Sequence, residues 1–354
     1  MNLLKFQKVI LYFFVFWGVF FLTCILFALY NHIQYEEIVL EENGVETVYK
    51  YDGNEQRLLS VFYALTILEK TENTLTIKTP CGKNVYVKDN GTNKYCLVQE
   101  SKVCYSTPKK VAILYISTGK YIKFWDNFYK EMEKYFLPNH EKTYFLFTDH
   151  DFIKVGKNVI KVHQDQLPWP YITLKRFHFF DGIKDQLKKY DYIYFLNGTM
   201  LPVDFVTEEI FPTKEQEIMV TLHPGYFKGK PEHLPYDRNS KSNAYIPKDS
   251  GKYYAMGGFN GGTSEGFLKL IETLKEWTDM DLANKVIPAW HDESMLNRYL
   301  LTKMNEGLQP LILIPEYAIP ETGHGNVDEF RPYTKQLILD KGKYGGHGNL
   351  RGTE

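Results

Sequence analysis

Beyond residue 110 the chain alternates apolar runs of strand length with segments of helical spacing, and this alternation restricts the fold more than any other feature. Residues 111–117, 143–148 and 192–196 are largely apolar runs. Residues 124–136 and 173–189 lie between them and repeat apolar side chains every three to four positions. Because strands joined through helices form βαβ units, the pattern predicts an α/β domain with a mostly parallel sheet.

The last of these runs ends on a neutral triplet, Asn197-Gly198-Thr199. In open α/β sheets ligands bind beyond the carboxyl ends of the strands, so the triplet stands where a ligand is expected. A plain glycine turn is the alternative. Asn-Gly-Thr is also an N-glycosylation sequon, and the same sequence recurs at residues 90–92.

Two later segments have the composition of ligand-binding loops. Residues 221–226 end a predicted strand with His223 beside a turn, although a loop histidine that only satisfies its own surroundings is the alternative. Residues 256–262 are rich in glycine, which lets the backbone approach a ligand closely. This glycine run lacks both the Walker lysine and the dinucleotide-binding spacing.

Residues 290–294 hold the densest group of reactive side chains. Trp290 and a histidine stand directly before Asp292 and Glu293, where a helix is expected to begin. The two acids either serve a site or only favour the positive end of the helix dipole. The adjacent indole and imidazole favour a site, because they supply an apolar wall and a donor.

The charge pattern separates a membrane segment from the rest. The 354-residue chain has a formal net charge of −1 and no basic stripe, which argues against nucleic-acid binding. Residues 9–30 are uncharged and long enough for one helix to cross a bilayer. Lys5 and Lys8 precede this run and glutamates follow it, so the positive-inside rule predicts a retained single-pass type II anchor. A cleaved signal peptide is the alternative.

Residues 31–108 alternate short strand-like runs with turn signals, which predicts a stem or a small β-rich accessory module. A short helix is expected at residues 58–68. Cys81, Cys96 and Cys104 permit either one disulfide with one free thiol or three free thiols. The predicted parts are therefore a cytoplasmic tail (1–8), a transmembrane signal anchor (9–30), the stem or module (31–108) and the α/β domain (109–354).

Several short blocks occur in a fixed order from residue 114 to the C-terminus: residues 114–121, 145–149, 169–177, 222–225, 244–247, 253–262, 290–297, 344–347 and 350–351. With these blocks the α/β domain resembles glycosyltransferase family 6, which contains the blood-group A and B transferases and the α1,3-galactosyltransferases. It most resembles the bacterial-type, metal-independent branch of that family. Residues 1–108 share only the general plan of an anchor and a stem.

The resemblance implies an A-type glycosyltransferase fold, which is Rossmann-like, and a catalytic domain at residues 109–354. It implies a retaining transfer from a UDP-sugar to the 3-hydroxyl of a galactose unit in a plain or fucosylated glycan. Donor choice would depend on Met256, Gly257 and Gly258. Gly258 resembles the members that use UDP-N-acetylgalactosamine and Met256 those that use UDP-galactose, with the former favoured. Glu293 is the candidate catalytic carboxylate, because glycosyl transfer passes through an oxocarbenium-like transition state.

By position, the resemblance assigns Ser117, Thr118 and Tyr121 to the border of the uridine. The animal enzymes carry two metal-binding aspartates where this chain has Asn197 and Thr199. The bacterial-type branch has asparagine at both places, so Thr199 departs even from that branch. An amide and a hydroxyl do not neutralise a hard cation as carboxylates do, and the prediction is an enzyme that needs no metal or other cofactor.

Without a metal, the leaving diphosphate needs cationic side chains. The resemblance offers Arg176 and, from a C-terminus that closes over the nucleotide, Arg351 with either Lys341 or Lys343. A solvated basic tail is the alternative.

The remaining assignments concern the sugars and the location. Asp292 matches a donor-binding position, and His223, Trp290 and Glu293 match acceptor-binding positions. A UDP-sugar supply behind a type II anchor suits the Golgi lumen, whereas the bacterial-type site points to a bacterial inner membrane. A different class of function is a catalytically inactive, membrane-anchored protein that binds nucleotide sugars or glycans.

Overall fold

The computed structural model describes residues 108–323 and 325–351 and, before them, only the seven strands within residues 36–97. Spatial contacts divide the chain into two units, Met1–Tyr105 and Ser106–Glu354. No helix in the described ranges is long and apolar enough to cross a membrane. The predicted anchor at residues 9–30 lies outside the described residues.

The first unit is a closed seven-stranded barrel. Consecutive strands pair antiparallel, and β1 closes the barrel by pairing in parallel with β7. The strands are β1 (Glu36–Glu42), β2 (Val45–Asp52), β3 (Arg57–Leu59), β4 (Ala64–Lys70), β5 (Thr74–Lys78), β6 (Asn84–Asp89) and β7 (Lys94–Leu97). The short helix predicted at residues 58–68 is wrong, because β3 and β4 pair there with Leu58 opposite Leu65. Thr66 and Ile67 are β-branched and favour the extended form.

The second unit is built on a seven-stranded sheet of order β10-β9-β8-β11-β14-β13-β15. Strands β8 to β11 run parallel, while β14 runs antiparallel to both β11 and β13. The strands are β8 (Lys110–Ile116), β9 (Glu141–Thr148), β10 (Val159–His163), β11 (Tyr192–Leu196), β13 (Ile218–Leu222), β14 (Ala255–Thr263) and β15 (Leu311–Leu313). The α/β class predicted from the sequence is confirmed, and the parallel-rich sheet is consistent with an A-type glycosyltransferase fold.

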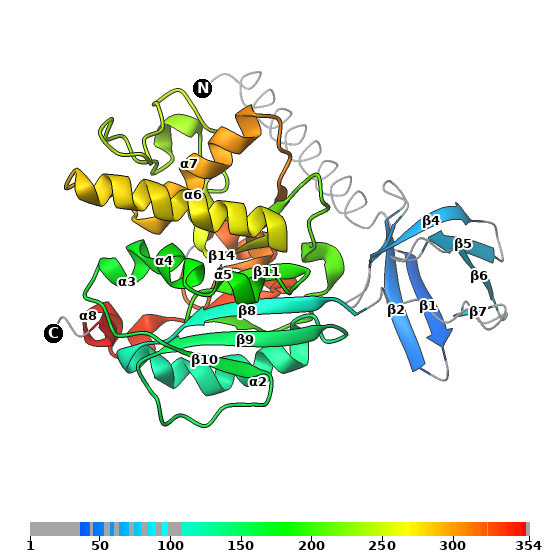
Figure 1. Ribbon diagram of the computed structural model, residues 1–354. Helices are drawn as coiled ribbons and strands as arrows, with labels where there is room; N and C mark the ends of the chain where they lie inside the picture. The colour runs from blue at the N-terminus through cyan, green and yellow to red at the C-terminus, as the bar shows by residue number, and fades with distance from the viewer. Residues whose placement is uncertain are drawn as a thin grey trace, which may run out of the picture. The chain divides into compact units, whose positions relative to one another are not determined.

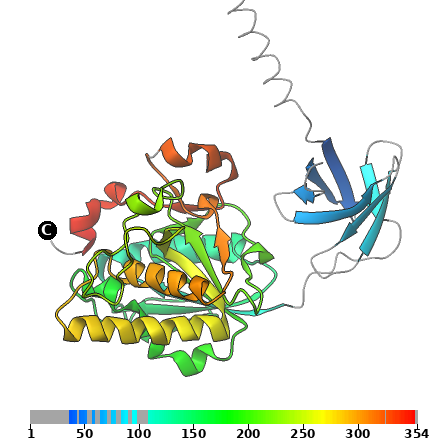
Figure 2. The same cartoon turned by 90° about the horizontal axis from the view of Figure 1, so that it is seen from above.

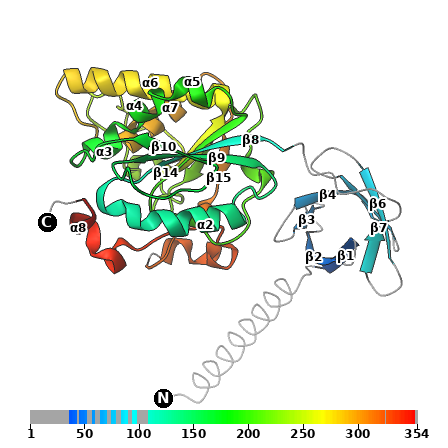
Figure 3. The ribbon, with the colours of Figure 1, turned by 60° about the horizontal axis from the view of Figure 1, so that its bottom comes forward.

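Helices cover both faces of this sheet, with α6 on one side and α2 on the other (Figures 1 and 3). Helices α6 and α7 run side by side over their face (Figure 2). On β8, Ala112 and Leu114 pack into the core under α4, α6 and α7, whereas Ile113 and Tyr115 pack against α2. Because successive side chains point to opposite faces and both faces are covered, the strand is apolar throughout. The helices are α2 (Trp125–Tyr135), α4 (Arg176–Asp181), α6 (Ser264–Ala283) and α7 (Asp292–Asn305).

The single helix predicted at residues 173–189 is broken into three short ones, α3 (Tyr171–Leu174), α4 and α5 (Lys184–Leu187). Its apolar face is nevertheless placed as predicted, since Leu174, Phe177 and Phe180 are buried against the sheet. Gly182 ends α4, which fits the low helix propensity of glycine. The break after α3 makes Arg176 the first residue of α4.

The C-terminal segment returns to the end of β11. A small sheet of order β12-β17-β16 joins β12 (Met200–Pro202), β16 (Ile319–Pro320) and β17 (Gln336–Ile338). The Leu339 N–H then donates to the Thr199 carbonyl at 2.8 Å. The last helix lies beside η1 and the start of α2 (Figure 3). The remaining short helices are η1 (Gly119–Phe124), η2 (Glu208–Ile210), η3 (Pro231–His233), η4 (Pro315–Tyr317), η5 (Gly325–Tyr333), η6 (Lys341–Tyr344) and α8 (Gly346–Arg351).

Candidate active site

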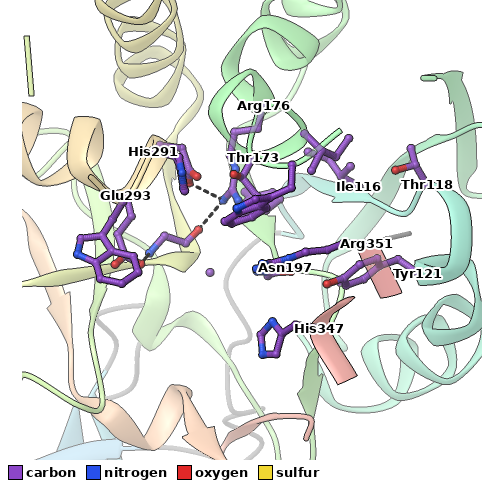
Figure 4. A pocket seen from close by; sticks show the side chains of 18 of the residues that line it. Ile116, Thr118, Tyr121, Thr173, Arg176, Asn197, His291, Glu293, His347 and Arg351 are labelled. Atoms are coloured by element: carbon purple, nitrogen blue, oxygen red, sulfur yellow. Dashed lines mark hydrogen bonds and ion pairs between the residues drawn. The ribbon is translucent and has the colours of Figure 1, made fainter. Parts of the chain in front are cut away.

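A cavity of about 620 Å³ opens beyond the carboxyl ends of β8 and β11. This is the edge of the sheet at which the sequence predicts a ligand. Glu293 and His291 lie on one side of the cavity, and Tyr121, His347 and Arg351 lie on the other (Figure 4). The first side is called the carboxylate wall here, and the second, with Lys341, the cationic wall.

The carboxylate wall is built on the first turn of α7. His291 precedes the helix with a positive φ of 55°, and Asp292 and Glu293 are its first two residues. Glu293 accepts two hydrogen bonds, at Oε1 from the Tyr254 hydroxyl (2.8 Å) and at Oε2 from the Gly257 N–H (2.7 Å). Burial raises the pKa of Glu293, and these two donors oppose the rise. The carboxylate therefore lines the cavity with both oxygens fixed.

Arg176 is buried behind this wall. Its Nη1 lies 3.0 Å from Asp292 Oδ2 and donates to the Gly257 carbonyl at 2.7 Å. The guanidinium also lies 4.3 Å from the ring centroid of Phe195. Burial raises the pKa of Asp292 to about 7, and the neighbouring Arg176 opposes the rise. The geometry makes Arg176 a tie between α4, β14 and α7.

The cationic wall comes from the C-terminal segment. The Arg351 guanidinium lies 3.5 Å from the ring centroid of Trp169, and its charge lowers the pKa of Tyr121 against the larger rise that burial causes. Burial and the nearby Arg351 lower the pKa of Lys341 to about 8. No carboxylate within the described ranges pairs with either cation, whereas Asp292 pairs with Arg176 on the opposite wall. Two cations held close together without an acid form a site for an anion.

Contacts outside the cavity fix the orientation of this segment. Lys343 forms an ion pair with Glu321, whose other carboxylate oxygen accepts from the Asp340 N–H at 2.8 Å. Lys120 hydrogen-bonds to Asn349. The Lys343 side chain thus faces Glu321 while Lys341 faces the cavity, which separates the two lysines that the sequence leaves as alternatives.

The neutral triplet forms part of the cavity floor. Asn197 and Gly198 line it, and the Gly198 carbonyl accepts from the Tyr115 hydroxyl at 2.8 Å. Thr199 is buried behind them. Over the residues that the structure describes, no three histidine, cysteine, aspartate or glutamate side chains gather as a metal site. The side chain that this strand end presents to the cavity is the neutral amide of Asn197, which brings no negative charge to a divalent cation.

Most residues proposed for the site line the cavity: Thr118, Tyr121, Arg176, Asn197, His223, Gly257, Gly258, Trp290, Asp292, Glu293, Lys341 and Arg351. Ser117, Thr199 and Met256 are buried outside the lining, and Lys343 is turned away from it. Trp169, His291 and His347 also line the cavity; the sequence gives Trp169 and His347 no role, and His291 only that of a donor beside Trp290. All three could have been assigned to the site from the sequence, because they lie inside the sequence blocks that carry the family resemblance.

The fold and the cavity define a class: an α/β protein whose strand ends carry an anion site opposite a buried carboxylate, the geometry of enzymes that transfer groups from anionic leaving groups. The chain belongs to glycosyltransferase family 6, whose family model matches residues 37–328. The match begins in the first unit, well before the blocks noted above.

Individual relatives support the same membership. The chain is similar to the O-antigen biosynthesis glycosyltransferase WbnI of Escherichia coli, with 32% identity over 243 residues, covering 68% of this chain and 99% of that protein. It is 30% identical over 217 residues to the histo-blood group ABO system transferase 1 of Rattus norvegicus, covering 59% of this chain and 60% of the relative. It is 29% identical over 217 residues to the globoside alpha-1,3-N-acetylgalactosaminyltransferase 1 of Gallus gallus, covering 58% and 61%. The chain thus spans under two thirds of the two animal relatives.

Proposed function

We propose that this glycosyltransferase moves N-acetylgalactosamine or galactose from a UDP-sugar to the 3-hydroxyl of a galactose unit in a glycan, with retention of anomeric configuration and without a metal. The observation that carries the proposal is the pairing of two walls across one cavity. Lys341 and Arg351 face it from the tail, and Glu293 faces it from α7.

The cationic wall suits a nucleoside diphosphate. As the donor bond breaks, negative charge grows on the diphosphate and must be stabilised where water is excluded. Lys341 and Arg351 supply positive charge from one segment, and Trp169 supports the Arg351 guanidinium. Arg176 contributes its charge from behind the opposite wall, although its hydrogen bonds go to the protein. Two ligand-facing cations take over the charge that a divalent ion would bring.

The carboxylate wall suits a developing oxocarbenium ion. Glu293 is held by two donors, so its oxygens stay oriented while the sugar charge grows. A carboxylate at this point either stabilises the cation during attack on the same face or forms a covalent intermediate that the acceptor then displaces. Both routes retain configuration.

The donor and acceptor ends follow from the lining. Gly258 lines the cavity, and an added Cβ there would meet the Met256 methyl at 2.5 Å. Glycine at this position lets the Met256 methyl pack against the backbone, and the preference for UDP-N-acetylgalactosamine rests on the resemblance of Gly258 to the members that use it. His223 and the half-exposed Trp290 lie at the open side near Glu293 and offer a donor and an apolar face to the acceptor galactose.

The test is a transfer assay with UDP-N-acetylgalactosamine and UDP-galactose, each with plain and fucosylated galactosides, with and without EDTA. We expect an α1,3-linked product that persists in EDTA and falls by about a thousand-fold or more in Glu293→Gln. Glu306→Gln is the matched control, because Glu306 lies at the far end of α7 and pairs with Lys303. UDP binding without product under every metal condition would support the inactive binding protein instead.

A further inference from the structure

Tyr254 is the side chain that contacts the Glu293 carboxylate directly on the side away from the Gly257 N–H. Tyr254 is 1% exposed and directly precedes β14. The hydroxyl donates to Glu293 Oε1 at 2.8 Å, while the Gly257 N–H donates to Oε2 at 2.7 Å. With one donor on each oxygen, the carboxylate plane is fixed from both sides.

Tyr254 is itself held by an aromatic cluster. Its ring centroid lies 5.4 Å from that of Tyr226, 5.5 Å from that of Tyr236 and 5.8 Å from that of His223. Its carbonyl accepts from the His223 N–H at 2.9 Å. Burial and the neighbouring Glu293 raise the pKa of Tyr254, so the phenol keeps its proton and remains a donor. One residue therefore contacts both Glu293 and the loop that carries His223.

We propose that Tyr254 is a positioning residue, whose hydroxyl holds the Glu293 carboxylate in its working orientation and whose ring sets the distance between Glu293 and His223. The inference rests on the function proposed above. It explains why a phenol is placed where phenylalanine would fill the same space in an aromatic cluster. The role is indirect, since Tyr254 does not line the cavity and acts through Glu293.

The sign of the pH effect follows from the groups around Glu293. Arg176 on α4 and the Tyr254 hydroxyl oppose the rise in the pKa of Glu293, and burial drives that rise. Asp292 on α7 pairs with Arg176, and His223, His291, Lys341 and Arg351 share the cavity. A donor to a carboxylate favours the ionised form. Removing the hydroxyl therefore raises the pKa of Glu293, and activity at the acid side is lost at a higher pH.

The experiment compares Tyr254→Phe with Tyr236→Phe. Tyr236 belongs to the same cluster, but its hydroxyl donates to the Tyr253 carbonyl at 2.6 Å rather than to Glu293. For Tyr254→Phe we expect kcat to fall about ten-fold and the acid limb of its pH profile to move up by about one pH unit, because a hydrogen bond to a charged group is lost. KM for either substrate should change less than about three-fold. Tyr236→Phe should leave the acid limb in place.

A second measurement reports on Glu293 without turnover. Stability is measured against pH for the wild type and for Tyr254→Phe, each with and without Glu293→Gln. Burial makes the pKa of Glu293 higher in the folded protein than in the unfolded chain. The free energy of unfolding therefore falls as pH rises above the pKa of the unfolded chain, and it stops falling and levels off above the pKa of the folded protein. The levelling point should lie about one pH unit higher with Tyr254→Phe. An unchanged levelling point would overturn the proposal, whereas a wild type without transfer would count against the proposed function alone.

Discussion

The two walls of the cavity hold opposite charges by different means. The carboxylate wall belongs to the core: Arg176 is 5% exposed, Asp292 is 6% exposed, and both are tied to backbone or to each other. The cationic wall belongs to the final residues, where Lys341 and Arg351 are only partly buried, Arg351 lies against the Trp169 ring, and the charge of Arg351 acts on Lys341. One wall is preorganised by packing, and the other is carried by a segment that crosses the cavity edge.

This difference suggests a division of labour. A carboxylate that faces a growing positive charge must not move, and burial in β14 and α7 provides that rigidity. A diphosphate must enter and leave, so its cations are better placed on a segment with few core contacts. Substitutions of the buried Arg176–Asp292 pair should therefore act on stability, and substitutions on the cationic wall should act on ligand affinity.

The largest effect should follow from Arg176→Met. The change leaves Asp292 buried without its partner, and breaking a buried pair costs about 3–5 kcal/mol. Chemical denaturation followed by circular dichroism would measure the loss. Adding Asp292→Leu should return part of the stability, because two apolar side chains tolerate burial better than one unpaired charge. A stability change below about 1 kcal/mol for Arg176→Met would show that the carboxylate wall is not held by this pair.

The next effect should come from Lys341→Ala combined with Arg351→Ala. Two charge-assisted contacts to the diphosphate contribute about 3 kcal/mol together, so UDP affinity should fall about a hundred-fold. Unfolding free energy should change by less than about 1 kcal/mol, since both side chains are partly exposed. Isothermal titration calorimetry with UDP measures the affinity.

Lys343→Ala is the matched control for this pair. Lys343 stands two residues from Lys341 on η6 but pairs with Glu321 outside the cavity. Its removal should change UDP affinity no more than about three-fold, because exposed ion pairs contribute little. An equal loss in both variants would contradict the assignment of Lys341 to the cavity.

The two walls also differ in how far the sequence predicts them. The first wall follows from local patterns: the apolar run at residues 192–196 gives β11, and Asp292 and Glu293 stand at a recognisable helix start. The partner of Asp292 does not follow in this way. Arg176 is separated from it by more than a hundred positions, and the single helix predicted around Arg176 is broken after Leu174 and at Gly182.

The orientation of the lysines on the cationic wall could not be predicted from the sequence. The sequence alone does not distinguish Lys341 from Lys343. Lys341 faces the cavity because Lys343 pairs with Glu321 and because β17 pairs with β12. These contacts join residues far apart in the chain, so no local sequence pattern predicts them. The role of Tyr254 is hidden for the same reason, since its hydroxyl meets a carboxylate on a later helix.

The smallest effect should be a pH dependence that belongs to the cationic wall alone. Burial and Arg351 lower the pKa of Lys341 to about 8, so this lysine is charged below that pH and loses its charge above it. A diphosphate prefers the charged form, and UDP affinity should therefore fall about ten-fold as pH rises from about 7 to about 9. Lys341→Arg should remove this step, because a guanidinium stays charged throughout the range. Titration calorimetry across these pH values would measure the UDP affinity of the wild type and of Lys341→Arg. A step of equal size in Lys341→Arg would place the titrating group elsewhere in the cavity. It would weaken the contrast between a buried ion pair on one wall and a tail whose charge depends on pH on the other.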